Sequence, residues 1–253
     1  MSSLSFIEPA GVTFLSNIGY WLVSRGCNPR FINIDNRNQS IIYLDDSLFF
    51  EQHCGSRLRV EACPRRTTQP LQRIDHDRIH SWLRMELIPW LSSCLGMTQS
   101  SLSMFQVCIS ELFNNINDHS IPNTGSIFVQ HYPNKNEIRI AVADFGPGIP
   151  STVARRAPNL TDVQAILKAV EPGFSSLSSP RNRGAGLDIL LETAVRRNGG
   201  RVTIFSQSSY VVFSQQGCHV HGGVGFCPGT TIDICLRTDT IEQIEDGPED
   251  LEW

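Results

Sequence analysis

Polar side chains recur along one nine-residue segment, Glu111 to His119, which reads ELFNNINDH. In a helix, Glu111, Asn115 and the pair Asp118 and His119 would share one face, because residues four and seven or eight positions apart lie on the same side. Glu111 could hold and deprotonate a water, while the amide oxygen of Asn115 suits Mg²⁺. A polar helix face that only meets solvent has the same spacing, so this segment alone leaves both interpretations open.

A second candidate site is the segment from Asp144 to Pro150, DFGPGIP, which directly follows an apolar run. A carboxylate at the end of a strand could accept a hydrogen bond from the amino group of a base. Gly146 and Gly148 would let the backbone approach the ring closely. A plain Asp-x-Gly turn at the end of a strand fits the same residues.

The third segment, RGAGL, runs from Arg183 through Gly184, Ala185 and Gly186 to Leu187, at the start of a predicted helix. The backbone N–H groups and the dipole of a helix N-terminus favour an anion there. A triphosphate tail could therefore bind at this loop, with Arg183 beside it. A Gly-x-Gly pattern by itself specifies no ligand.

The elements that must position these segments follow from hydrophobic periodicity. Helices are predicted where apolar residues recur every three or four positions, and strands where they alternate with polar ones. The predicted helices cover residues 74–91, 101–119, 161–170 and 187–198, and the predicted strands cover residues 126–131, 137–143, 201–206, 210–213 and 230–236. Helices that segregate from a mostly antiparallel sheet predict an α+β fold, a two-layer α/β sandwich with helices on one face of the sheet.

The start of the chain predicts a separate small α/β unit. The polar, proline-flanked stretch PRRTTQP at residues 64–70 predicts a boundary after it. The elements expected in this unit are a helix over 11–26, strands over 30–34 and 41–44, and a helix from Asp45 or Asp46. The expected division of the chain is the small unit at 1–63, a linker and helix entry at 64–79, a second domain at 80–237 and an acidic tail at 238–253.

Composition and charge exclude several classes of protein. The chain has 253 residues, 40% of them apolar and 18% charged, so it can bury a core and lacks the bias of disordered or fibrous proteins. The formal charge is −4, and residues 238–253 include seven acids and no Lys or Arg, so nucleic acid is not an expected partner. There is no membrane-length apolar run, leader pattern or Cys-x-x-Cys pair, which predicts a cytoplasmic protein without a membrane partner.

Taken in order, these segments resemble the GHKL ATPase superfamily. The chain shows E-x-x-x-N-x-x-D-H, then D-x-G-x-G, the stretch GFSSLSSPRNR, G-x-G-L, and finally PGTT before a closing strand. The superfamily includes the nucleotide-binding domains of gyrase, the ninety-kilodalton heat-shock chaperone, sensor histidine kinases and mismatch-repair ATPases. The resemblance spans about residues 80–237 and implies a domain that binds ATP with Mg²⁺.

The resemblance also implies a role for each matching residue. Glu111 matches the residue that activates water, Asn115 matches the Mg²⁺ ligand, and Asp144 matches the carboxylate that reads adenine. The other matches are Asp118 and His119 near the phosphates, Gly146 and Gly148 beside the adenine and at the hinge of a lid, Gly184 and Gly186 around the phosphates, and Thr230 behind the adenine. The lid that the family places between Gly148 and Gly184 contains Arg and Lys side chains here, one of which could meet the γ-phosphate.

Three functions fit these features: slow ATP hydrolysis that switches a cytosolic bacterial regulator, serine/threonine kinase activity toward a STAS-like partner, and ATP sensing without turnover. Water and a protein hydroxyl need the same base, metal and phosphate contacts, so the sequence does not separate them. Residues 1–63 faintly resemble a STAS-like fold, and a nucleotide-dependent homodimer is a further expectation. Histidine autophosphorylation is not expected, because His76 and His80 lack a His-Glu-x-x-x-Pro pattern and a hairpin of two long helices.

Overall fold

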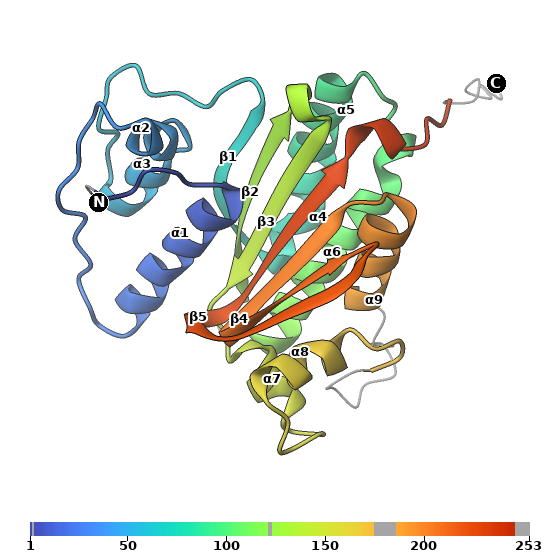
Figure 1. The fold of residues 1–253 in the computed structure, drawn as a ribbon. Helices are drawn as coiled ribbons and strands as arrows, with labels where there is room; N and C mark the ends of the chain where they lie inside the picture. The colour runs from blue at the N-terminus through green and yellow to red at the C-terminus, as the bar shows by residue number, and fades with distance from the viewer. Residues whose placement is uncertain (2, 121–122, 175–185, 246–253) are drawn as a thin grey trace.

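A computed structural model describes residues 1, 3–120, 123–174 and 186–245 of the chain. Within these residues, five strands form one antiparallel sheet in the order β1-β2-β3-β5-β4, with helices on both faces (Figure 1). The predicted α+β class with a mostly antiparallel sheet is confirmed. The strands are β1 (Thr68–Asp75), β2 (Thr124–Tyr132), β3 (Glu137–Asp144), β4 (Arg201–Ser214) and β5 (Gly217–Arg237).

The helices form three groups around the sheet. One group, α4, α5, α6 and α9, covers one face, α1, α2 and α3 cover the other, and α7 and α8 lie beyond the end of β3 (Figure 1). Short π-helical turns, Leu83–Leu87 and Glu192–Arg197, continue α4 and α9. The helices are α1 (Pro9–Ser24), α2 (Gln39–Asp46), α3 (Phe49–Cys54), α4 (His76–Trp82), α5 (Ile88–Leu95), α6 (Ser103–His119), α7 (Gly148–Val153), α8 (Asp162–Ala169) and α9 (Gly186–Leu191).

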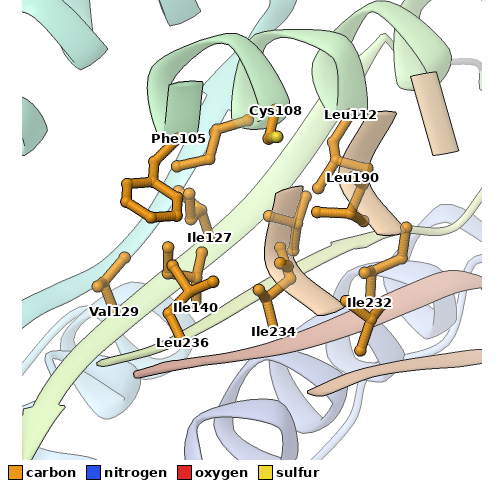
Figure 2. Close-up of a cluster of buried hydrophobic side chains, with 14 of the residues drawn as sticks. Phe105, Cys108, Leu112, Ile127, Val129, Ile140, Leu190, Ile232, Ile234 and Leu236 are labelled. Carbon is orange, nitrogen blue, oxygen red and sulfur yellow. The ribbon is translucent and has the colours of Figure 1, made fainter. Parts of the chain in front are cut away.

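The main core lies between the sheet and the layer that contains α6. This helix presents Phe105, Cys108 and Leu112 to the sheet, and alternate side chains of β2, β3 and β5 point back at them (Figure 2). The burial of large apolar side chains contributes about 1.5–3 kcal/mol each. The apolar stripe therefore sets the rotation of α6 about its axis, and its polar stripe is turned toward the ends of the central strands.

A second, smaller core lies on the opposite face of the sheet. Apolar side chains of α1, α2 and α3 pack there against Leu71 of β1 and Phe128 of β2. Phe128 points away from the main core, whereas its neighbours Ile127 and Val129 point into it, because successive side chains of a strand alternate between faces. Both faces of β2 are therefore buried.

The prediction of two strands within residues 1–63 is wrong, because the described part of this region contains helices and no strand. Residues 41–44 lie in α2, where the side chain of Asn38 accepts a hydrogen bond from the N–H of Ser40 at 2.8 Å and caps the helix. Ile41 and Leu44, one turn apart, are both buried against the second core. The N-terminal unit is helical, and its resemblance to a STAS-like fold is not confirmed.

A strand that the periodicity did not reveal, β1, lies in the segment predicted as a linker at 64–79. Pro70 is tolerated inside it because β1 is an edge strand and because its register with β2 shifts between Gln69 and Gln72. The sheet thus includes residues that precede the predicted start of the second domain at residue 80. The domain boundaries themselves stay a prediction.

The elements predicted after residue 100 are present, with changes at their ends. The two strands predicted at 201–206 and 210–213 form one strand, β4, and β5 begins well before residue 230. The two strands continue past the sheet as a long hairpin because they pair with each other up to Ser214 and Gly217. Among the described residues, no helix combines the length and apolarity that crossing a membrane requires.

Candidate functional site

A cavity of about 660 Å³ lies between α6, the end of β3, residues 230–232 of β5, α7 and the start of α9. Its size falls in the range of small-molecule sites, about 300–1,000 Å³. Most of the predicted site residues line it, namely Glu111, Asn115, Asp118, His119, Asp144, Gly148, Gly186, Leu187 and Thr230. Segments that are far apart in the sequence therefore meet at one place.

The remaining predicted residues lie beside the cavity or outside the described part of the chain. Gly146 lines a neighbouring cavity of about 380 Å³, which also includes His119. Arg183, Gly184 and Ala185 fall outside the described residues, so the predicted phosphate loop is represented by Gly186 and Leu187.

Asp144 is the last residue of β3 and is partly buried. Its carboxylate accepts hydrogen bonds from the N–H of Gly146, at 2.7 Å, and from the N–H of Thr230. Burial raises the pKa of Asp144 to about 6, although both N–H donors act in the opposite direction. The carboxylate is thus fixed by main-chain groups, and it retains acceptor capacity for a ligand.

Two glycines after Asp144 are required by close contacts. A Cβ atom at Gly146 would lie 2.9 Å from Oδ1 of Asp144 and 3.0 Å from Cα of Ser120. Gly148 has a φ of +79°, and a Cβ there would lie 2.8 Å from Oγ of Ser206. The predicted need for glycine at both positions has this physical basis, independent of any ligand.

Ser206 of β4 supports the site from outside the cavity, and the sequence patterns did not predict its role. Its buried hydroxyl accepts a hydrogen bond from the N–H of Ile149 at 3.0 Å and donates one to the carbonyl oxygen of Gly229 at 2.7 Å. It thereby ties the loop after β3 to β5, next to Thr230. Ser206 is one of four serines in β4, and no sequence pattern distinguishes it from the others.

On α6, Glu111 and Asn115 lie one turn apart, as predicted, and both are partly buried. The side-chain amide of Asn114 donates to Oε1 of Glu111 at 3.2 Å, and Oδ1 of Asn114 lies 3.0 Å from Nε2 of His76. Because the NH₂ group of Asn114 faces a carboxylate, its oxygen must be the acceptor, so Nε2 of His76 carries the proton. This chain of hydrogen bonds orients the carboxylate of Glu111. Asn114 was not among the predicted site residues, although its position three residues after Glu111 in a predicted helix indicates that the two side chains can meet.

The end of the cavity near α9 combines a close backbone contact with the titratable side chains of Asp118 and His119. Gly186, at the start of α9, packs against Asn115, and a Cβ there would lie 2.9 Å from Nδ2 of Asn115. Burial lowers the pKa of His119, the Asp118 carboxylate counteracts this, and Arg155 lowers it further. Arg155, which follows α7, lines the neighbouring cavity together with His119.

Residues 102–240 match the model of the family described as histidine kinase-, DNA gyrase B-, and HSP90-like ATPase. The matched residues are more than half of the chain and contain α6, β3, β5, α7 and the start of α9, which line most of the cavity. The chain belongs to this family. The predicted resemblance to the GHKL ATPases is confirmed, and the protein contains an ATP-binding domain of the ATPase or kinase type. No match was found among curated proteins or among solved structures.

Proposed function

We propose that the protein binds Mg·ATP and hydrolyses it slowly, as a nucleotide-driven regulatory switch. The observation that carries this proposal is that Glu111 and Asn115 of α6 share one cavity with Asp144 at the end of β3 and Thr230 of β5. A base, a metal ligand and an acceptor for a nucleobase thus border a space large enough for a nucleotide.

Adenine would bind at the end of β3, beside Thr230 of β5. The ionised carboxylate of Asp144 would accept a hydrogen bond from the 6-amino group, while the N–H groups of Gly146 and Thr230 keep the carboxylate in place. The apolar side chains of Val142 and Ile232 also line the cavity and suit the face of a base.

The residues present fit Mg²⁺ that is held mainly by phosphates. Among the described residues, no group of three or more His, Cys, Asp or Glu side chains is placed to hold a metal ion. Mg²⁺ in nucleotide sites keeps waters and phosphate oxygens and takes only one or two protein oxygens, of which Asn115 offers one. When bound, the cation would neutralise charge on the phosphates.

Glu111 would accept a proton from the attacking water. The water oxygen bonds to the γ-phosphorus while the bond from that phosphorus to the bridging oxygen breaks, and ADP and inorganic phosphate leave. The hydrogen bond from Asn114 to Oε1 of Glu111 would aim the carboxylate at the water. The hydroxyl of a STAS-like or other regulatory partner could replace water as the group that attacks the γ-phosphorus, with the same residues in the same roles. In a site that only senses ATP, Glu111 would not act as a base.

The test is incubation with γ-labelled ATP, with Mg²⁺ or with a chelator, in the absence and presence of a candidate STAS-like partner. Slow release of labelled phosphate by the protein alone, which needs Mg²⁺, supports hydrolysis. Label on the partner would show kinase activity instead, and ATP binding without either product would show a sensor. A nucleotide-dependent homodimer would appear as a change in mass on ATP addition, measured by light scattering in the same samples.

The metal role is tested by Asn115→Ala, with Asn123→Ala as a matched control. The side chain of Asn123 bonds to Asn117 on the surface and does not line the cavity. Asn115→Ala should weaken ATP binding in Mg²⁺ by about tenfold, the usual size of a lost ligand interaction, and change little in the chelator. Equal behaviour in both conditions would remove Asn115 from the metal site.

A further inference from the structure

The N-terminal helix α1 crosses the sheet on the face opposite to α6 and contacts β2, β3 and β5 (Figure 1). Its residue Asn17 is 1% exposed and lies where β3 ends and β5 approaches it. The side-chain Nδ2 of Asn17 donates to the carbonyl oxygen of Asp144 at 2.6 Å and to the carbonyl oxygen of Pro228 at 3.2 Å. One amide group thus links the two chain segments that border the nucleobase end of the cavity.

The orientation of this amide follows from its partners. Both partner atoms are carbonyl oxygens, which only accept hydrogen bonds, so the NH₂ group and not the oxygen of Asn17 must face them. Its two hydrogens are then both used. A smaller or apolar side chain at position 17 would leave two buried main-chain acceptors without these donors.

The segments that Asn17 joins also hold the carboxylate of Asp144. Thr230, which donates to that carboxylate from its main-chain N–H, follows Pro228 by two residues. Between them, Gly229 passes so close to β3 that a Cβ would lie 2.2 Å from the carbonyl oxygen of Asp144. A change in the separation of these segments would therefore move the Thr230 donor relative to the Asp144 carboxylate.

We infer that Asn17 is a positioning residue for nucleobase recognition: it sets the spacing between the end of β3 and residues 228–230 of β5, where the Asp144 carboxylate meets the 6-amino group of adenine. The inference rests on the proposed function, because it concerns the ligand of the same cavity. Residue 17 lies far outside the matched family residues, 102–240, so the N-terminal helical unit contributes to a site that the ATPase domain alone does not complete.

A matched control lies one turn earlier on the same helix. Thr13 is also fully buried, but its hydroxyl donates to the carbonyl oxygen of Pro9, within α1 itself. Thr13→Val removes a buried hydrogen bond within α1 and leaves the hydrogen bonds of Asn17 to Asp144 and Pro228 in place. A general loss of packing in α1 would affect both variants, whereas a positioning role would affect only the Asn17 variant.

The experiment measures the dissociation constants of ATP and of inosine triphosphate, which carries an oxygen in place of the 6-amino group. For Asn17→Ala we expect ATP binding to weaken by about tenfold, the effect of one unmet buried hydrogen bond, and inosine triphosphate binding to stay within about threefold. Thr13→Val should leave the ratio of the two constants as in the wild type. If Asn17→Ala does not fold, Asn17→Ser, which keeps a shorter donor, carries the same comparison.

A second measurement needs no nucleotide. Amide hydrogen exchange at Gly146 and Thr230 should be faster in Asn17→Ala than in the wild type and in Thr13→Val, because both N–H groups bond to the Asp144 carboxylate. An unchanged ATP-to-inosine triphosphate ratio overturns the inference, whether or not exchange changes. A wild type that binds neither nucleotide refutes the proposed function as well, and the two failures are thereby told apart.

Discussion

Asp144 stands at the end of a strand and takes its hydrogen bonds from main-chain N–H groups, whereas Glu111 stands on a helix and is held by the side chain of Asn114. Main-chain donors in a paired strand have one position, set by the register that places Asp144 opposite Thr230. A side-chain donor can change rotamer at a modest cost. In one cavity, the group proposed to recognise a base is therefore fixed by the backbone, and the group proposed to move a proton is fixed by side chains.

The largest effect is expected from a substitution of Asp144, the carboxylate that main-chain N–H groups hold. Asp144→Asn replaces an acceptor oxygen by an NH₂ group, which would face the N–H donors of the site and the amino group of adenine. We expect ATP affinity to fall by about 30- to 100-fold or more, equivalent to about 2–3 kcal/mol. Calorimetry measures this, with Asp162→Asn as the control, because that carboxylate bonds to Ser208 outside the cavity. Near wild-type affinity in Asp144→Asn would remove this residue from the site.

The next largest effect is expected from a substitution of Glu111, the carboxylate that the side chain of Asn114 holds. Glu111→Gln keeps the shape of the side chain and an acceptor for Asn114 but removes the base. Turnover should fall by about 10²-fold or more while Mg·ATP affinity stays within a few fold. Steady-state phosphate release and calorimetry test both parts, with Glu192→Gln on the surface of the α9 extension as the control. If Glu111→Gln retains turnover, Glu111 is not the group that accepts the proton of the attacking water.

The third prediction concerns the pH dependence of ATP binding, which follows from the pKa of Asp144. Because burial raises the pKa of Asp144 to about 6, protonation below this pH removes the acceptor that adenine needs. ATP affinity should fall by about tenfold between pH 7 and pH 5, since about one tenth of a group with that pKa is ionised at the lower pH. Inosine triphosphate has the same titrating phosphates and serves as the control. A parallel fall for both nucleotides would assign the effect to the phosphates.

The smallest effect sharpens the role of Asn114. Asn114→Leu removes the donor to Glu111 and should lower turnover by about three- to tenfold, with little change in ATP affinity. In the Glu111→Gln background the same substitution should have almost no further effect, because its partner no longer acts as a base. Additive losses in this double-mutant cycle would show that Asn114 acts independently of Glu111.

Local patterns were sufficient for the parts of the site that lie within one element. Glu111 and Asn115 are one turn apart in any helix, and the burial of Phe105 and Leu112 on the opposite stripe follows from the same periodicity. The position of Asp144 after an apolar strand was equally local. By contrast, the short apolar run at residues 41–44 fits a strand or a helix, and only its packing against the second core makes it part of α2.

The sequence by itself determined that the motifs containing Glu111, Asn115 and Asp144 occur in an order resembling the GHKL ATPases, because each motif is a property of neighbouring residues. Only the tertiary structure decided that the Thr230 N–H meets the Asp144 carboxylate, that His76 bonds to Asn114, and that Asn17 reaches the carbonyl oxygen of Asp144. These contacts join residues far apart in the chain. Local periodicity carries no information about which distant segments meet, because that depends on how the whole core packs on both faces of the sheet.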